Sequence, residues 1–264
     1  MERYKESISV FVPVYNERDS VRTVAEEISD YLKSRFSDYE ILLITSDKST
    51  DGTTEIALAL EREIPHLRVV NRGSDWSYAG ALRTGFKNAK KELIFFTDGD
   101  RQFDIHELDL LMDAIKRFDV VTGYKIKRND PLMRIWMSWL YNVTMRTVFR
   151  LSIRDINGAF KLYRRKVVDA VHFLPDLTQG VVNVEMYLTA REHGYTIGEV
   201  GVHHFHRLAG SPDSEIGTRG KIIAFVRPHI ILESLKDTYK LWKKVHGWGG
   251  GTQSTVSKNP DKTQ

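Results

Sequence analysis

Short apolar runs alternate with amphipathic segments through the first hundred residues, and this alternation limits the possible folds more than any other feature of the chain. Residues 7–14 form an apolar run rich in β-branched side chains, which predicts a β-strand. The apolar residues of the next segment have helical spacing and are Val21, Val24, Ala25, Ile28 and Leu32. The same order recurs, with strands at 40–45, 67–70 and 92–97 and helices at 54–63 and 79–89. Such alternation indicates the α/β class, with a mostly parallel sheet covered by helices on both faces.

The composition provides enough apolar material for the core of such a sheet. Of the 264 residues, 41% are hydrophobic and 28% are charged, ordinary values for a globular domain that argue against a disordered chain. Cysteine is absent, which excludes disulfides, thiolate zinc sites and cysteine nucleophiles. No run approaches the roughly 18 apolar residues of a membrane span, and the N-terminal residues are polar. We therefore expect neither a transmembrane helix nor a secretory signal.

The pattern changes after residue 120. We predict a strand at 119–124, a long helix at 131–149, a helix at 183–193 and a strand at 196–202. Residues 221–246 have a helical period interrupted by Pro228, and the last residues are rich in Gly, Ser, Thr and Lys. We expect one α/β domain over 1–218, basic amphipathic helices over 219–248 and a disordered tail over 249–264.

The two halves of the chain differ in charge. Residues 1–120 carry 17 Lys and Arg against 23 Asp and Glu, whereas residues 121–264 carry 22 against 12. The net charges are therefore −6 and +10, and a basic half indicates an anionic partner, either nucleic acid or an acidic membrane surface. A merely solvated surface is the alternative. Compact nucleic-acid recognition motifs are missing from the basic half, so we expect no nucleic-acid binding.

Polar clusters follow three of the predicted strands. They are Asn16-Glu17, Ser46-Asp47 and Asp98-Gly99-Asp100. In an open α/β sheet, ligands bind outside the carboxyl ends of the strands. The three clusters are therefore expected to meet at one edge of the sheet.

Asp98 and Asp100 deliver two carboxylates directly after a strongly apolar strand, and Gln102 adds a third oxygen two residues later. Two such charges need a cation, and hard oxygen ligands suit Mg²⁺ or Mn²⁺ bridging to a diphosphate. The alternative is an acidic surface turn, since Asp and Gly both favour turns. The position after the apolar strand favours the metal site.

The first strand ends in residues that suit a nucleoside. Tyr15 can place an aromatic ring against the nucleoside and Glu17 a carboxylate, while Asp47 can accept a hydrogen bond from the base. Taken singly, a residue such as Tyr15 is more often a packed aromatic and one such as Asp47 more often a helix cap. Their expected location at the same edge favours a nucleotide site.

The long helix at 131–149 carries a cationic stripe on an otherwise apolar surface. The stripe recurs every four residues and consists of Arg134, Ser138, Asn142, Arg146 and Arg150. A helix that lies in a lipid headgroup layer uses Trp and Tyr as anchors and Arg for lipid phosphates. The alternative is a core or dimer helix with one solvated face. Residues 221–246 are also amphipathic and basic, and we expect them to attach the protein peripherally to a membrane.

Five segments have an order and a strand-end placement that agree with one another. They are Val12-Pro-Val-Tyr-Asn-Glu17, Ser46-Asp-Lys-Ser-Thr-Asp-Gly-Thr53, Gly80-Ala-Leu-Arg-Thr-Gly85, Asp98-Gly-Asp-Arg-Gln102 and Asp155-x-x-x-Ala-Phe-Lys161. Over about residues 7–211 the chain resembles the family 2 glycosyltransferases of GT-A fold, and most of all the dolichyl- or polyprenyl-phosphate sugar synthases. The resemblance implies a Rossmann-like, mostly parallel mixed sheet flanked by helices, with interfacial helices toward the C-terminus.

The resemblance also implies roles for single residues. The nucleotide-sugar site would comprise Pro13, Tyr15, Glu17, Ser46, Asp47, Asp98, Gly99, Asp100, Arg101 and Gln102, with the metal on Asp98, Asp100 and Gln102. The acceptor phosphate would be bound by Lys125, Arg134, Ser138 and Arg207. Asp100 and Arg207 would be the catalytic pair, because Arg207 resembles the arginine placed between the donor diphosphate and the acceptor phosphate.

The chain departs from the family pattern at three places. Ser46 stands where a first Asp is common, Lys125 stands where Arg is usual, and Pro212-Asp213 follow where a loop Lys is frequent. The cluster of His203, His204 and His206 is not expected to be a zinc site, because strand alternation places His203 on the opposite face from the other two.

The expected function is the inverting transfer of a hexose from a UDP- or GDP-sugar to a polyprenyl or dolichyl phosphate. It would take place at the cytoplasmic face of a membrane, with the enzyme attached peripherally. One alternative is transfer to a saccharide hydroxyl, with a general base among Asp155, Glu185 and Glu199. Another is a catalytically silent nucleotide-sugar or membrane-binding protein. Glu185 is expected to have no more than a structural place on its helix.

Overall fold

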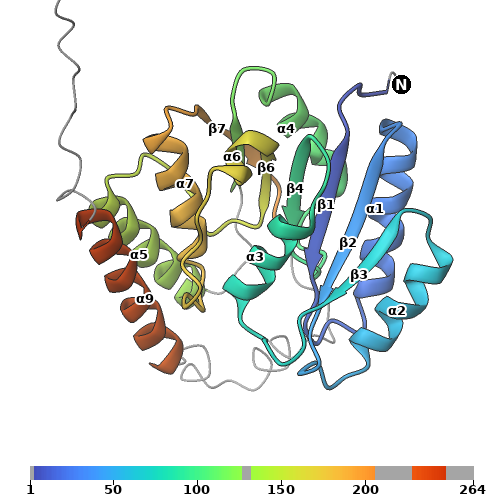
Figure 1. Ribbon diagram of the computed structural model, residues 1–264, viewed down its shortest axis with the longest axis horizontal. Helices are drawn as coiled ribbons and strands as arrows, with labels where there is room; N and C mark the ends of the chain where they lie inside the picture. Colours follow the sequence, from blue (N-terminus) through green and yellow to red (C-terminus); the bar gives the residue numbers. More distant parts are fainter. Residues whose placement is uncertain (1–2, 127–131, 206–227, 248–264) are drawn as a thin grey trace, which may run out of the picture.

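The computed structural model describes residues 3–126, 132–205 and 228–247, without the side chains of residues 134 and 228–230. Within these residues the strands form a seven-stranded sheet in the order β3-β2-β1-β4-β6-β5-β7 (Figure 1). The strands are β1 Ile8–Pro13, β2 Tyr39–Thr45, β3 Leu67–Asn71, β4 Leu93–Thr97, β5 Val120–Lys125, β6 Phe160–Arg164 and β7 Ile197–Val202. The helices are α1 Val21–Arg35, α2 Thr53–Glu63, α3 Tyr78–Asn88, α4 Leu108–Ala114, α5 Leu132–Phe149, α6 Arg165–Asp169, α7 Val182–Glu192 and α9 Pro228–Gly247. A 3₁₀ turn, η1 Ile105–Glu107, precedes α4.

The predicted α/β class and the mostly parallel sheet are confirmed. β1 pairs in parallel with β2 and β4, β2 with β3, and β5 with β7. The predicted strands and helices of the first hundred residues are present, with bounds shifted by one or two residues. Parallel pairing brings the carboxyl ends of β1, β2 and β4 to the same edge of the sheet.

β6 is the strand that the sequence pattern did not reveal. It runs antiparallel between β4 and β5, so that Phe96 lies opposite Lys161. A lysine as the second residue of a buried strand interrupts the apolar run by which the other strands are recognised, although its side chain is fully buried here. The mixed character of the sheet comes from this one strand.

The sheet is covered on both faces, because successive side chains of each strand point to opposite sides. On one face, Phe11 and Phe96 pack with residues of α3, α5 and α7. On the other, Val10 and Phe95 pack with residues of α1, α2 and α4. Complete burial of such side chains stabilises the fold by roughly 1.5–3 kcal/mol each.

The long helix predicted at 131–149 is α5, and the helical segment predicted at 221–246 contains α9, which begins at Pro228, a residue favoured in the first turn of a helix. Figure 1 shows α5, α7 and α9 together at one side of the molecule. Leu241 of α9 is buried in the same core cluster as Met145 of α5. The helix is thus part of the body of the domain, whereas the sequence suggested a separate membrane-proximal unit. The predicted tail at 249–264 lies outside the described residues.

Candidate functional site

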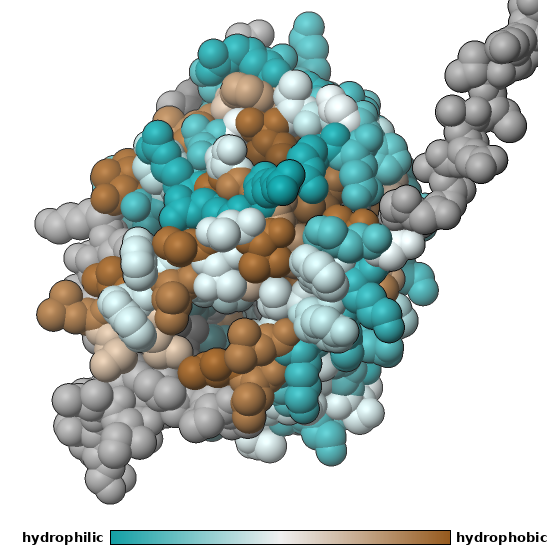
Figure 2. Space-filling model, turned by 90° about the vertical axis from the view of Figure 1, so that its left-hand side faces the viewer, coloured by the Kyte–Doolittle hydropathy of each residue, from teal (hydrophilic) through white to brown (hydrophobic). Residues whose placement is uncertain are grey.

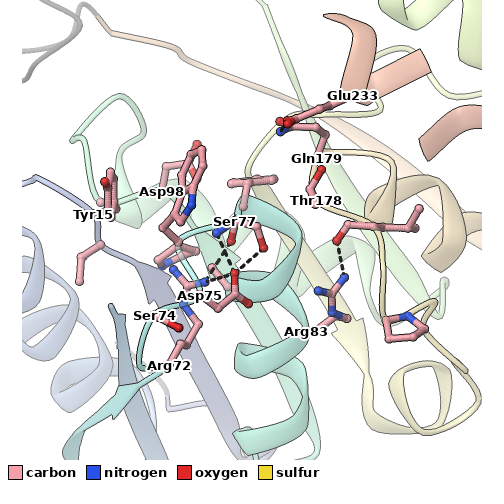
Figure 3. A pocket seen from close by; sticks show the side chains of 18 of the residues that line it. Tyr15, Arg72, Ser74, Asp75, Ser77, Arg83, Asp98, Thr178, Gln179 and Glu233 are labelled. Atoms are coloured by element: carbon pink, nitrogen blue, oxygen red, sulfur yellow. Dashed lines mark hydrogen bonds and ion pairs between the residues drawn. The ribbon is translucent and has the colours of Figure 1, made fainter. Parts of the chain in front are cut away.

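A pocket of about 650 Å³ opens at the carboxyl ends of the central strands (Figure 3). Its lining comes from the segments after β1, β3 and β4, from α3, from the loop before α7, and from α9. The lining residues are Pro13, Val14, Tyr15, Glu17, Arg72, Ser74, Asp75, Trp76, Ser77, Tyr78, Ala81, Arg83, Asp98, Gly99, Pro175, Asp176, Leu177, Thr178, Gln179 and Glu233. The expected meeting of the first and third polar clusters at one edge of the sheet is present.

The segments after β1 and β4 are tied closely together. A Cβ atom on Gly99 would lie 2.9 Å from Val14 Cγ1 and 3.2 Å from Pro13 O, so only glycine fits there without a shift. The hydroxyl of Ser20 donates to Gly99 O at 2.7 Å and to Glu17 Oε2 at 3.0 Å. These contacts set the position of the residues on either side of Gly99.

Asp98 lines the pocket, while Asp100 and Gln102 are almost completely buried beside it. Asp100 Oδ1 accepts a hydrogen bond from the backbone N–H of Gln102 at 3.1 Å. The Gln102 side chain donates through Nε2 to Phe205 O at 3.1 Å, and Phe205 N donates to Gln102 O at 2.9 Å. The loop after β4 is therefore held in one conformation against the end of β7.

This donor set fits a divalent cation that substrate phosphates complete. Mg²⁺ is usually held by one or two carboxylates together with phosphate oxygens, and the strand end offers the two carboxylates of Asp98 and Asp100. Gln102 uses its amide nitrogen for Phe205, which leaves its amide oxygen as the atom suited to a metal. Among the described residues, no group of three Asp, Glu, His or Cys side chains is placed to hold a metal ion.

Five of the residues assigned to the nucleotide-sugar site are not part of the pocket lining, namely Asp100 and Gln102, which are buried beside it, and Ser46, Asp47 and Arg101. Ser46 is buried, and its hydroxyl donates to Gly73 O at 3.0 Å. Asp47 Oδ1 accepts from Asn71 Nδ2 at 2.7 Å, at the end of β3. Arg101 has a positive φ of 60°, and its guanidinium pairs with Glu27 of α1 at 2.6 Å. The structure thus places Arg101 on the α1 side of the loop.

Of the residues assigned to the acceptor phosphate, the structure describes the side chains of Lys125 and Ser138, and neither lines the pocket. Lys125 ends β5, with its Nζ 5.9 Å from the centre of the Phe103 ring. Ser138 is half-buried on α5, where its backbone oxygen accepts from Asn142 Nδ2 at 2.9 Å. The side chain of Arg134 is not among those that the structure describes. His206 and Arg207 also lie outside the described residues.

The start of α3 contributes pocket residues that the sequence analysis did not single out. Asp75 Oδ1 accepts from the N–H and the hydroxyl of Ser77 at 2.8 and 2.7 Å, and Ser77 caps α3 by accepting from Gly80 N. Arg72 donates to Ser77 O at 3.0 Å, and burial lowers the pKa of its guanidinium. The Trp76 ring lies 6.5 Å from that of Tyr15. Asp and Ser before an apolar helix are a capping signal that could have located this turn.

The opposite wall is formed by residues far apart in the sequence. Thr178, Gln179 and Glu233 line it, the last of them from α9. Local sequence patterns carry no signal for such a contact, and the sequence analysis missed all three residues.

Glu185 has a structural place on α7, as expected. Its carboxylate is buried and accepts from Leu174 N at 2.9 Å and from Lys244 Nζ of α9 at 3.3 Å. Burial raises the pKa of this carboxyl group, which lies outside the main pocket. Glu199, another candidate base, accepts from the N–H of Arg154 at 2.8 Å and likewise does not line the pocket. His203 is exposed and His204 buried, as strand alternation predicts.

Comparison with known sequences and structures agrees with the observed fold. The chain is 28% identical over 218 residues to a dodecaprenyl-phosphate galacturonate synthase of Rhizobium johnstonii, covering 76% of this chain and 64% of that protein. It is 26% identical over 218 residues to a dolichyl-phosphate β-glucosyltransferase of Trichomonas vaginalis, covering 77% and 67%. The chain thus spans about two thirds of the length of these relatives.

Among solved structures, glucosyl-3-phosphoglycerate synthase from Mycobacterium tuberculosis, in complex with Mn²⁺, UDP-glucose and phosphoglyceric acid, superposes with a TM-score of 0.59. The match covers 81% of this chain and 75% of that one at 17% identity, which shows a shared fold. The family model for glycosyl transferase family 2 matches residues 9–171, a range that includes β1, the loop after β4 and β6. The chain therefore belongs to glycosyl transferase family 2.

Proposed function

We propose that this protein transfers a hexose, with inversion at the anomeric carbon, from a UDP- or GDP-sugar to the phosphate of a polyprenol or dolichol. The observation that carries the proposal is the pocket in which Tyr15 and Asp98 line the same cavity at the strand ends (Figure 3). Its volume, about 650 Å³, is within the usual range for a ligand of nucleotide-sugar size. The names of the relatives support a prenyl phosphate acceptor.

In this proposal Asp98, Asp100 and Gln102 would hold Mg²⁺ or Mn²⁺, and the ion would supply positive charge to neutralise a departing diphosphate. The half-exposed Tyr15 ring packs against the nucleoside, with Pro13 and Glu17 beside it. Asp47, which follows β2, would accept a hydrogen bond from the base, although it is not part of the pocket lining. The close approach of Gly99 to Val14 and Pro13 brings the backbone beside Asp98 against the end of β1.

The acceptor needs positioning more than activation. A phosphate monoester has a second pKa near 6, so its attacking oxygen is already largely ionised at neutral pH and needs no strong general base. Lys125, Arg134, Ser138 and Arg207 are proposed to hold this phosphate, with Arg207 between it and the donor diphosphate. The cationic groups of the lysine and the two arginines would offset the repulsion between two anionic substrates.

The face formed by α5 and α9 is proposed as the membrane contact. Large apolar side chains are exposed on both helices, namely Leu132, Met133, Trp136, Trp139 and Leu140 on α5 and Ile231, Leu232, Leu235, Tyr239 and Trp242 on α9. Figure 2 shows hydrophobic patches on this face beside a hydrophilic area. Aromatic and aliphatic side chains next to lysines are typical of helices that lie in the interface of a bilayer. None of the described helices is long and apolar enough to cross a membrane.

The test is an assay with radiolabelled UDP- and GDP-sugars, a short polyprenyl phosphate and Mn²⁺. Label that moves into an organic-extractable lipid supports the proposal, provided that Asp98→Asn and Asp100→Asn abolish the transfer. Label found only in water-soluble glycan would indicate a saccharide acceptor and overturn it. Absence of any metal-dependent product would indicate a binding protein.

A further inference from the structure

The pocket has two ends of different chemistry. One end would hold the nucleoside, and the following inference is about the opposite end, where the sugar would lie. Figure 3 shows Tyr15 and Asp98 on one side of the pocket and Gln179 and Glu233 on the other. If the nucleoside lies at Tyr15 and the diphosphate at Asp98, as proposed above, the transferred sugar extends toward the second side. The following inference rests on that proposed function.

The wall at the sugar end is anchored by a buried carboxylate of α9. Asp237 is 2% exposed, and its Oδ2 accepts from Thr178 N at 2.8 Å, Thr178 Oγ1 at 3.2 Å and Gln179 N at 3.1 Å. From the other side, Arg83 of α3 donates to Leu177 O at 2.8 Å. The backbone at 177–179 is thus held between two helices, and a wall held in this way can discriminate between ligands.

Two polar side chains project from this wall into the pocket lining. Gln179 Nε2 donates to Glu233 Oε2 at 2.9 Å, which orients the amide against the carboxylate. The pair still offers carboxylate and amide oxygens as acceptors, and acceptors of this kind bind sugar hydroxyl groups. A second carboxylate brought near Glu233 would instead be repelled.

Among the described residues, the carboxylate of Glu233 pairs with the neutral amide of Gln179 and forms no ion pair. The two basic residues of the lining are Arg72 and Arg83. Arg72 lies 3.5 Å from Asp75, whereas Arg83 keeps its positive charge and donates to Leu174 O and Leu177 O. The repulsion expected for an anionic sugar is therefore that of the Glu233 carboxylate itself.

We propose that Gln179 and Glu233 form the recognition site for the transferred sugar and select a neutral hexose against a uronate. The selectivity of this chain would then differ from that of its relative from Rhizobium johnstonii, which is named for galacturonate. The helix that carries apolar side chains on its exposed surface thereby also supplies the specificity wall of the donor pocket.

The experiment uses donor pairs that differ only at C6, namely UDP-glucose with UDP-glucuronate and GDP-mannose with GDP-mannuronate. Dissociation constants are measured by calorimetry with Mn²⁺, without an acceptor, so the result does not depend on transfer. For whichever base binds, the neutral sugar is expected to bind about 10- to 100-fold more tightly than the uronate, as one nearby like charge predicts. Equal affinity, or preference for the uronate, would overturn the inference while leaving the proposed transfer intact.

Variants separate recognition from folding. Glu233→Gln is expected to reduce the preference at least 10-fold, mainly by improving uronate binding, and to leave the affinity for UDP or GDP alone unchanged. Asp237→Asn is expected to weaken binding of the neutral donor more than binding of the nucleotide alone, because it loosens residues 178–179. Glu192→Gln makes the same charge change on an exposed part of α7. It should change neither the affinity ratio of neutral sugar to uronate nor the affinity ratio of neutral donor to nucleotide alone. An unchanged preference in Glu233→Gln would refute the inference, whereas failure of every donor in the transfer assay would refute the proposed function.

Discussion

Lys161 Nζ, at the centre of the sheet, donates a hydrogen bond of 2.9 Å to Asn183 Oδ1 of α7. A second hydrogen bond, of 2.6 Å, goes to Ile156 O. Burial lowers the pKa of this ammonium group to about 7, although Asp155 and Asp98 act in the opposite direction. The strand that makes the sheet mixed therefore also places a titratable group behind the candidate metal site.

Stability should depend on pH through Lys161. The ordinary pKa of lysine is 10.5, so between about pH 7 and 10.5 the unfolded chain binds more protons than the folded one. The free energy of unfolding should therefore rise with pH in this window, by up to about 1.4 kcal/mol per unit. Urea titrations between pH 7 and 9, with EDTA present, measure the slope. Lys161→Met should lack this contribution, and parallel profiles for the two proteins would contradict the prediction.

Removal of the metal should abolish transfer without unfolding the protein. Asp98→Asn and Asp100→Asn each reduce the charge that holds the cation, and we expect a loss of about 100-fold or more in kcat. EDTA should have the same effect on the unmodified protein, and excess Mn²⁺ should reverse it. Circular dichroism checks that the variants are folded, and full activity in EDTA would rule out a metal-dependent mechanism.

Gly99→Ala should damage both the fold and the site. The added methyl group would meet Val14 Cγ1 and Pro13 O, and such overpacking costs about 1–3 kcal/mol. Since Asp98 and Asp100 flank this residue, donor affinity should fall as well. Gly247→Ala is the matched control, because a Cβ atom at that position has no neighbour within 4 Å. Thermal unfolding and calorimetry with a nucleotide sugar give the two readouts, and equal behaviour of both variants would disprove the close contact.

Binding to vesicles should depend on the exposed leucines of α9. Leu232→Glu and Leu235→Glu each replace an apolar side chain that would enter the lipid interface, so partitioning should fall about 10-fold or more. Co-sedimentation with vesicles that contain anionic lipid measures the effect. Leu110→Glu changes a similarly exposed leucine on α4 and should bind as the unmodified protein does. Loss of binding in all three variants would argue against a contact specific to α9.

Much of the pocket around Tyr15 and Asp98 could be predicted from the sequence, because it depends on the order of apolar and polar residues along the chain. An apolar run followed by polar residues locates the end of a strand, and parallel pairing brings the ends of β1 and β4 together. On these grounds Tyr15, Glu17 and Asp98 are expected at one edge of the sheet, and all three line the pocket. Arg101 was assigned to the same site, but it does not line the pocket, and its guanidinium pairs with Glu27 of α1.

The sugar end could not be predicted in the same way. Gln179 and Glu233 are 54 positions apart, and their contact depends on how α9 packs against the loop before α7. The sequence analysis did not predict strand β6 for a related reason. The burial of Lys161 depends on partners from α7 and from the preceding loop.

The sequence by itself determined the α/β class, the strand ends that carry the acidic pair, and the apolar, basic character of α5 and α9. Periodicity and strand order are local properties, so they can be read from the residues. The tertiary structure alone decided that β6 lies antiparallel inside the sheet and that α9 forms one wall of the pocket, with Glu233 in the lining and Asp237 holding residues 178–179. Both depend on contacts between distant segments, whose free energy arises only when the packed elements exclude water from them.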